Sequence, residues 1–220
     1  MPDANWDIAI GGDRVSAALD RADESRRIVF VCAHGAGGNM SDKGILAVTR
    51  AIRAKGIDTV RFNFIYSQKR AGGPDPMPKC MSVISAVVDR VRTELRPSML
   101  IFGGRSMGGR AASMLAAEGF RADRLLLLAY PLHPPGHPEK LRDEHLPAIK
   151  MPVLCLNGTR DTFCQRPLME QVLARLGANW TMHWLEGADH GFHVRKSSGR
   201  TDADVMTETA TEVNSWLAKA

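Results

Sequence analysis

One serine lies between two pairs of glycines in the segment GGRSMGGR, Gly103 to Arg110. Gly104 and Gly108 stand two positions before and two positions after Ser106, which gives the spacing G-x-S-x-G. The apolar run before the serine predicts a strand, and the alanine-rich run after it predicts a helix. A sharp strand-to-helix turn crowds both flanking positions, so glycine is required there. Ser106 is therefore a candidate nucleophile on such a turn, and the alternative is an ordinary polar residue in a flexible glycine loop.

A serine hydroxyl is a poor nucleophile until a histidine takes its proton and an acid orients that histidine. Both residue types follow in the chain: Asp161 in LNGTRD and His190 in LEGADHGF, each directly after a predicted strand. We expect Ser106, Asp161 and His190 to converge, because the carboxyl ends of parallel strands share one edge of a sheet. The structural alternatives are a helix cap for Asp161 and a turn histidine for His190. His193 is the substitute base if His190 points away.

The reaction of a serine with an acyl group also needs two hydrogen-bond donors for the oxyanion that develops. The loop AHGAGGN follows the predicted strand RIVFVC, and its glycines allow the backbone to approach a substrate. We assign the donors to the backbone N–H groups of Ala36 and Met107, with Gly37 as the alternative to Ala36. His34 either holds this loop by side-chain hydrogen bonds or contacts the substrate.

These residues must be held by strands that are covered on both faces, and five apolar runs without polar alternation have this character. They span 27–35, 58–64, 98–104, 124–130 and 151–159. Helical apolar stripes separate them, so the chain predicts an α/β fold with a doubly wound, mostly parallel sheet. Two short runs joined at Gly11 and Gly12 predict a β-hairpin at the edge of this sheet. The segments 66–80 and 131–147 are rich in proline and glycine and predict irregular loops.

The two irregular loops follow strands, where ligands bind in open α/β sheets. We therefore place Arg70 and His133 in the predicted substrate pocket, together with His34 and Gly37. His133 and His137 also have a spacing found in metal sites, but no acidic or cysteine ligand accompanies them, and we predict no metal. The loop HGAGGN resembles a dinucleotide-binding loop only in part, because Met40 stands where a third glycine is needed. We predict no cofactor.

Composition limits the remaining possibilities. The 220 residues, 44% of them apolar, are enough for one hydrophobic core, so we expect a single domain over residues 1–220. The formal net charge of +5 comes from scattered Lys and Arg without aromatic interleaving, which predicts no nucleic-acid partner. We expect a cytoplasmic protein without a membrane partner, because neither a signal-peptide pattern nor a membrane-length apolar run is present. The four cysteines form no CxxC pair, and we expect reduced thiols.

The segments AHGAGG, RFNF, GGRSMGGR, NGTRD, GADHGF and YPLHPPGHPEKLRDEHL resemble the α/β-hydrolase superfamily over nearly the whole chain. More narrowly, they are similar to the dienelactone-hydrolase-like small hydrolases that include testis-expressed-protein-type members. The resemblance implies a hydrolase sheet with no large lid domain and places Ser106, Asp161 and His190 at the triad positions. Dienelactone hydrolases proper carry cysteine where this chain has Ser106, so their substrate is not carried over.

The sequence therefore predicts a serine hydrolase that cleaves an ester or thioester of a small or solvent-projecting acyl group through an acyl-enzyme. A small-molecule acyl substrate is the expected partner, and the oligomeric state stays open. The alternative from another class is a hydrolase-like interaction module whose triad is vestigial or occluded.

Overall fold

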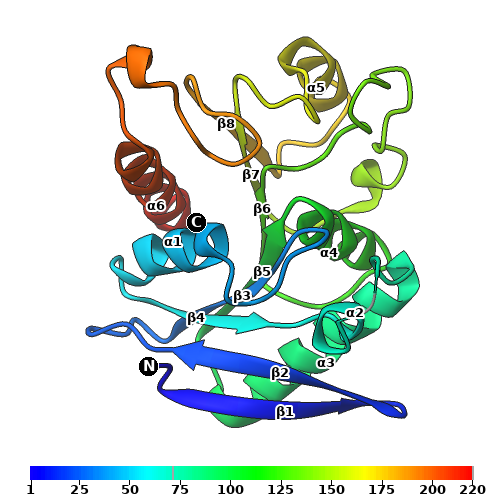
Figure 1. Cartoon of the computed structure of the whole chain (residues 1–220), viewed down its shortest axis with the longest axis vertical. Coiled ribbons are helices and arrows are strands. Elements are labelled where there is room, and N and C mark those ends of the chain that lie inside the picture. Colours follow the sequence, from blue (N-terminus) through cyan, green and yellow to red (C-terminus); the bar gives the residue numbers. More distant parts are fainter. Residues whose placement is uncertain (71, 220) are drawn as a thin grey trace.

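The computed structural model describes residues 1–70 and 72–219, and eight strands form one sheet at its centre (Figure 1). The spatial order of the strands is β1-β2-β4-β3-β5-β6-β7-β8. Their bounds are β1 Ala4–Ile10, β2 Asp13–Asp20, β3 Ile28–Ala33, β4 Ile57–Phe62, β5 Met99–Arg105, β6 Arg124–Leu128, β7 Val153–Gly158 and β8 Trp180–Leu185. The strands from β4 to β8 in this order pair in parallel, whereas β1 and β2 form an antiparallel hairpin that pairs antiparallel with β4. The sheet is therefore mostly parallel with the predicted hairpin at one edge.

Helices cover both faces of this sheet. Their bounds are α1 Lys43–Arg53, α2 Ile65–Gln68, α3 Met77–Leu95, α4 Met107–Ala117, α5 Arg166–Leu173 and α6 Asp202–Ala218, with short 3₁₀ turns at Leu146–Ala148 and Lys196–Ser198. Figure 1 shows α1 beside α6 on one side of the sheet and α3 beside α4 on the other, and these two pairs are in contact. The fold is thus a doubly wound α/β architecture, and residues 1–70 and 72–219 form no separate lid domain.

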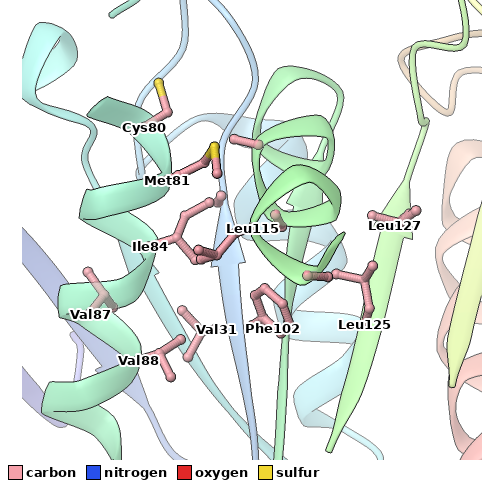
Figure 2. Close-up of a cluster of buried hydrophobic side chains, with 14 of the residues drawn as sticks. Val31, Cys80, Met81, Ile84, Val87, Val88, Phe102, Leu115, Leu125 and Leu127 are labelled. Atoms are coloured by element: carbon pink, nitrogen blue, oxygen red, sulfur yellow. The ribbon is translucent and has the colours of Figure 1, made fainter. Parts of the chain in front are cut away.

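The core consists of two clusters, one on each face, because side chains alternate along a strand. In β3, Val29 and Val31 point to the larger cluster, whereas Phe30 and Cys32 point to the smaller one. The larger cluster packs α3 and α4 on the sheet (Figure 2) and includes Val31, Ile84, Val88, Phe102, Leu115 and Leu125. The smaller cluster packs α1 and α6 on the opposite face. This two-sided burial is why the strands are continuous apolar runs rather than alternating ones.

One boundary differs from the sequence prediction. The segment 66–80 was expected to be irregular, but α2 ends only at Gln68 and α3 already begins at Met77. Pro78 lies in the first turn of α3, where a missing backbone N–H costs nothing because those amides have no partner inside the helix. Proline here starts a helix instead of interrupting one.

The parallel strands bring their carboxyl ends to one edge of the sheet. Ala33 at the end of β3 pairs with Gly104 near the end of β5, and Gly158 at the end of β7 pairs with Leu185 at the end of β8. The connections that follow these strands therefore meet above the same edge. Ser106, Asp161 and His190 all lie on these connections.

Candidate active site

Ser106 occupies a strained turn between β5 and α4. Its backbone dihedral angles are φ 52° and ψ −120°, a conformation that L-residues with a side chain rarely adopt. The turn requires glycine on both sides of the serine. A Cβ at Gly104 would overlap the backbone of Ala33, and one at Gly108 would lie 2.5 Å from the carbonyl oxygen of His34. The backbone N–H of Ser106 donates to the carbonyl of Leu128 in β6 over 2.9 Å, which fixes the turn to the sheet.

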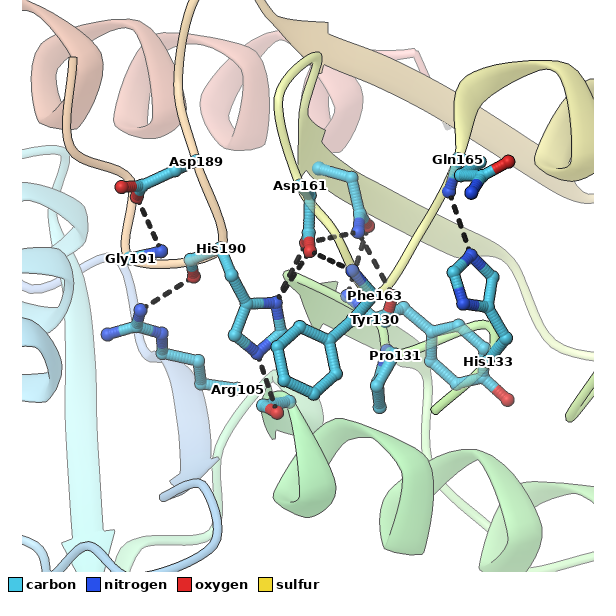
Figure 3. Close-up of polar contacts among 12 residues, drawn as sticks. Arg105, Tyr130, Pro131, His133, Asp161, Phe163, Gln165, Asp189, His190 and Gly191 are labelled. Carbon is cyan, nitrogen blue, oxygen red and sulfur yellow. Dashed lines mark hydrogen bonds and ion pairs between the residues drawn. The ribbon is translucent and has the colours of Figure 1, made fainter. Parts of the chain in front are cut away.

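A continuous chain of hydrogen bonds joins the three residues that the sequence singled out (Figure 3). Ser106 Oγ lies 2.9 Å from His190 Nε2, and His190 Nδ1 lies 2.9 Å and 2.8 Å from Asp161 Oδ1 and Oδ2. A carboxylate only accepts hydrogen bonds, so Nδ1 carries the proton and Nε2 is left as an acceptor. Nε2 is therefore oriented to take the proton of the Ser106 hydroxyl.

The carboxylate of Asp161 is enclosed by the protein, with a fully buried side chain. Besides His190, it accepts hydrogen bonds from the backbone N–H of Phe163 at 2.8 Å and from Asn157 Nδ2 at 3.1 Å. Three donors compensate this buried charge, as a buried carboxylate requires. The sequence analysis missed Asn157. Its position at the end of an otherwise apolar strand, four residues before Asp161, was the signal that it left unused.

Two further contacts hold His190, one at its imidazole ring and one at its backbone. The ring of Phe163 stacks on it with a centroid distance of 4.3 Å, and Arg105 Nη2 donates to the backbone carbonyl of His190 over 2.7 Å. Phe163 covers one face of the ring, and the ring edge with Nε2 stays directed at Ser106 Oγ. Neither contact follows from the sequence, because both join connections that are far apart along the chain.

A surface cavity of about 290 Å³ opens at Ser106 and His190. Ala36, Arg105 and Phe163 also line it. Among the described residues, neither Ala36 N–H nor Met107 N–H has a hydrogen-bond partner, and Met107 is the first residue of α4. Amides at a helix N-terminus carry partial positive charge and are free to bind an anion. The two assigned oxyanion donors are thus available, with Ala36 at the wall of the cavity.

The four residues assigned to the substrate pocket separate into two groups. Gly37 and Arg70 line a second cavity of about 720 Å³, which shares Gly38 with the first. His34 and His133 line neither cavity and are buried.

Both buried histidines act as loop supports. His34 Nε2 accepts from the backbone N–H of Phe64 over 3.2 Å, and its Nδ1 lies 2.8 Å from the carbonyl of Gly35. Burial lowers the pKa of His34, so the ring is held neutral. His133 makes the same kind of contacts, to Gln165 N and to the carbonyl of Pro134. The alternative base His193 is exposed and pairs with Asp202 over 2.6 Å.

A second serine–histidine pair lies inside the fold, where Ser113 Oγ is 2.7 Å from His145 Nε2. Ser113 is buried in the middle of α4, and its hydroxyl also donates to the carbonyl of Arg110. Within the described residues no carboxylate hydrogen-bonds to His145, and burial lowers the pKa of this histidine to about 4. Ser113 is buried and its histidine has no acid to orient it, so we interpret Ser113 and His145 as a structural pair. Ser106 remains the candidate nucleophile.

Residues 1–70 and 72–219 contain neither of two further kinds of site. No three His, Cys, Asp or Glu side chains in this part of the chain lie close enough together to hold a metal ion. No helix there is both long and apolar enough to span a membrane.

Known proteins resemble this chain in sequence family and in overall fold. Residues 26–218 match the family model described as the alpha/beta hydrolase domain. A lidless α/β serine hydrolase from Xanthomonas campestris is similar over 98% of this chain and 96% of its own, with 21% identity and a TM-score of 0.78. Est1E from Butyrivibrio proteoclasticus, with ferulic acid bound, is similar over 97% of this chain and 99% of its own (17% identity, TM-score 0.76). A dienelactone hydrolase from Anabaena variabilis is similar over 98% of this chain and 96% of its own, with 18% identity and a TM-score of 0.73. At such low identities, the solved structures show only that the fold is shared. Because the family model matches most of the chain, this protein belongs to the α/β hydrolase family.

Proposed function

We propose that this protein is a serine hydrolase that cleaves carboxylic esters or thioesters through an acyl-enzyme, with Ser106, His190 and Asp161 as its catalytic triad. One observation carries the proposal: the hydrogen-bonded chain from Ser106 Oγ through His190 to the buried Asp161 carboxylate, next to an open cavity. The same three side chains in this geometry perform acyl transfer on unrelated folds.

The chemistry follows from the atoms in place. His190 Nε2 takes the hydroxyl proton as Ser106 Oγ bonds to the acyl carbon, and Asp161 stabilises the imidazolium that forms. The backbone N–H groups of Ala36 and Met107 stabilise the oxyanion. When the bond between the acyl carbon and the leaving group breaks, His190 returns the proton to the leaving oxygen or sulfur. In the second half of the reaction, His190 takes a proton from a water molecule as its oxygen bonds to the acyl carbon. The bond from that carbon to Ser106 Oγ then breaks, His190 returns the proton to Oγ, and the carboxylic acid leaves.

The shape of the site supports a small acyl substrate. The cavity at Ser106 is about 290 Å³, which is at the lower end for small-molecule sites, and the fold has no lid to enclose a long chain. We therefore infer that the acyl group is short or projects into solvent. The adjoining cavity, with Gly37 and Arg70 in its lining, gives room for the rest of the molecule.

The proposal is tested by labelling with a fluorophosphonate probe, which reacts with activated serines. We expect rapid labelling of the wild type and loss of labelling in Ser106→Ala and His190→Ala. Ser113→Ala removes the other histidine-bonded serine and is expected to label normally. A series of p-nitrophenyl esters of increasing acyl length then measures the acyl preference, and kcat/KM should fall for long chains.

The competing interpretation is an interaction module in which the triad does not function. It predicts that the folded wild type neither labels nor hydrolyses esters. The 2.9 Å contact between Ser106 and His190 and the open cavity favour catalysis over this alternative.

A further inference from the structure

The residue that precedes the nucleophile reaches the loop that carries the base. Arg105 ends β5, next to Ser106, and its Nη2 donates to the backbone carbonyl of His190 over 2.7 Å (Figure 3). The two partners lie 85 residues apart in the chain. One side chain therefore connects the nucleophile turn with the histidine loop, independently of the bond between Ser106 and His190.

The histidine loop is itself a tight turn. The carboxylate of Asp189 accepts from Gly191 N over 2.7 Å and from His193 N over 3.0 Å, and Phe192 N donates to the Asp189 carbonyl. Phe192 is buried with φ 64°, and its ring lies 5.7 Å from the guanidinium carbon of Arg105. Arg105 thus touches this turn twice, at the carbonyl of its histidine and at the face of its buried aromatic ring.

Burying the Arg105 guanidinium costs free energy, because the charge loses part of its hydration. Desolvation by the surrounding protein lowers the pKa of Arg105. The charges of nearby aspartates act against this shift, but among the described residues none forms a direct ion pair with the guanidinium. The side chain fits only because the second residue of α1 is a glycine, since a Cβ at Gly44 would overlap Nη1. A partly buried charge paired with a neutral carbonyl and a ring adds little to stability. Its hydrogen bond instead ties the backbone of His190 to the end of β5, next to Ser106.

We propose that Arg105 is a positioning residue that holds the His190 loop at the distance needed for proton transfer from Ser106. The inference rests on the proposed hydrolase function. Arg105 also lines the cavity at Ser106, so direct binding of an acidic substrate is the rival role. The two roles differ kinetically: lost positioning lowers kcat, whereas lost uniform substrate binding raises KM.

The test compares Arg105→Ala and Arg105→Lys with the wild type, using p-nitrophenyl acetate and fluorophosphonate labelling. Loss of positioning is expected to lower kcat and the labelling rate of Arg105→Ala by roughly 10- to 100-fold, with KM changed less than about threefold. Arg105→Lys keeps the charge but not the planar fork, and it should recover only part of the rate. Guanidinium ion at millimolar concentration should restore Arg105→Ala, whereas sodium chloride at equal ionic strength should not.

The matched control is Arg200→Ala. Arg200 Nη1 donates over 2.9 Å to the carbonyl of Glu186, which belongs to the same connection between β8 and α6 but lies away from the cavity. This variant loses the same kind of contact, together with the ion pair between Arg200 and Glu208, and is expected to keep its kcat.

A second readout does not depend on turnover. The imidazole N–H of His190 that bonds to Asp161 is expected to give a protected low-field proton resonance in the wild type and a broadened one in Arg105→Ala. An unchanged kcat and resonance, a raised KM alone, or an equal effect of Arg200→Ala would overturn the proposal. If the wild type is inactive, the proposed function fails, and the resonance still decides the role of Arg105.

Discussion

The amide of Asn157 makes four polar contacts without reaching solvent. Its Nδ2 donates to the carbonyl of Tyr130 at 3.0 Å and to Asp161 Oδ2 at 3.1 Å. Its Oδ1 accepts from Tyr130 N at 3.0 Å and from Cys155 Sγ at 3.3 Å. One side chain thereby ties the end of β6 to the carboxylate that orients the base.

Replacing Asn157 by leucine, which is similar in size, should reduce both stability and reactivity. The change leaves the backbone N–H of Tyr130 without its partner, takes one of two donors from the Tyr130 carbonyl and removes a donor from Asp161, a loss of about 2–3 kcal/mol in the free energy of unfolding. Labelling of Ser106 should slow as well, because the carboxylate loses a constraint. Urea denaturation and probe kinetics measure the two effects.

Asn179→Leu provides the comparison for this variant. Asn179 Nδ2 donates to the carbonyls of Ile149 and Met151, away from Ser106, so this variant should lose stability but keep its labelling rate per folded molecule. Equal labelling rates in the two variants would contradict the role given to Asn157.

At the scale of elements, the turn between β5 and α4 depends on close approach of two backbones. Gly108→Ala places a methyl group 2.5 Å from the carbonyl oxygen of His34, so α4 must move away from β3. We expect a loss of at least about 2 kcal/mol, or failure to fold, since overpacking against backbone cannot be relieved by a rotamer change. Thermal unfolding measures this loss. Gly12→Ala, where nothing lies within 4 Å of the added Cβ, should change stability by less than about 1 kcal/mol.

The elements were predictable because their chemistry is local. The apolar runs 27–35, 58–64, 98–104, 124–130 and 151–159 coincide with β3 to β7, since burial on both faces makes such strands uniformly apolar. The order of the three site residues also follows from the chain. The contacts of Asn157 and Arg105, and the burial of His34 and His133 away from the cavity, arise from packing between distant connections. No local pattern contains that information.

At the scale of the whole molecule, two histidines kept neutral by burial make stability depend on pH. Burial lowers the pKa of His145 to about 4 and lowers that of His34, against 6.5 for the unfolded chain. Above pH 6.5 the ring is neutral in both states, and its contribution to stability is fully present. As pH falls from 6.5 toward 4, the unfolded chain takes up the proton and the folded chain does not. The free energy of unfolding therefore falls across this window.

His145→Gln tests this dependence and keeps a donor for Ser113. The variant should lose less stability than the wild type between pH 7 and pH 5, by about 1 kcal/mol after allowance for solvent screening. Urea denaturation at the two pH values measures the difference. Parallel pH profiles for both proteins would show that His145 does not contribute.

The hydrogen-bonded chain from Ser106 to Asp161 joins three connections, and its serine and histidine lie 84 positions apart in the sequence, its histidine and aspartate 29 positions apart. The three residues come together only when the strands from β5 to β8 have assembled side by side, because each residue follows a different strand of this set. The reactivity of the Ser106 hydroxyl can therefore be used to follow folding kinetics. After dilution from denaturant, the rate at which probe labelling appears reports when the strands from β5 to β8 have come together, and chains arrested before that step do not label.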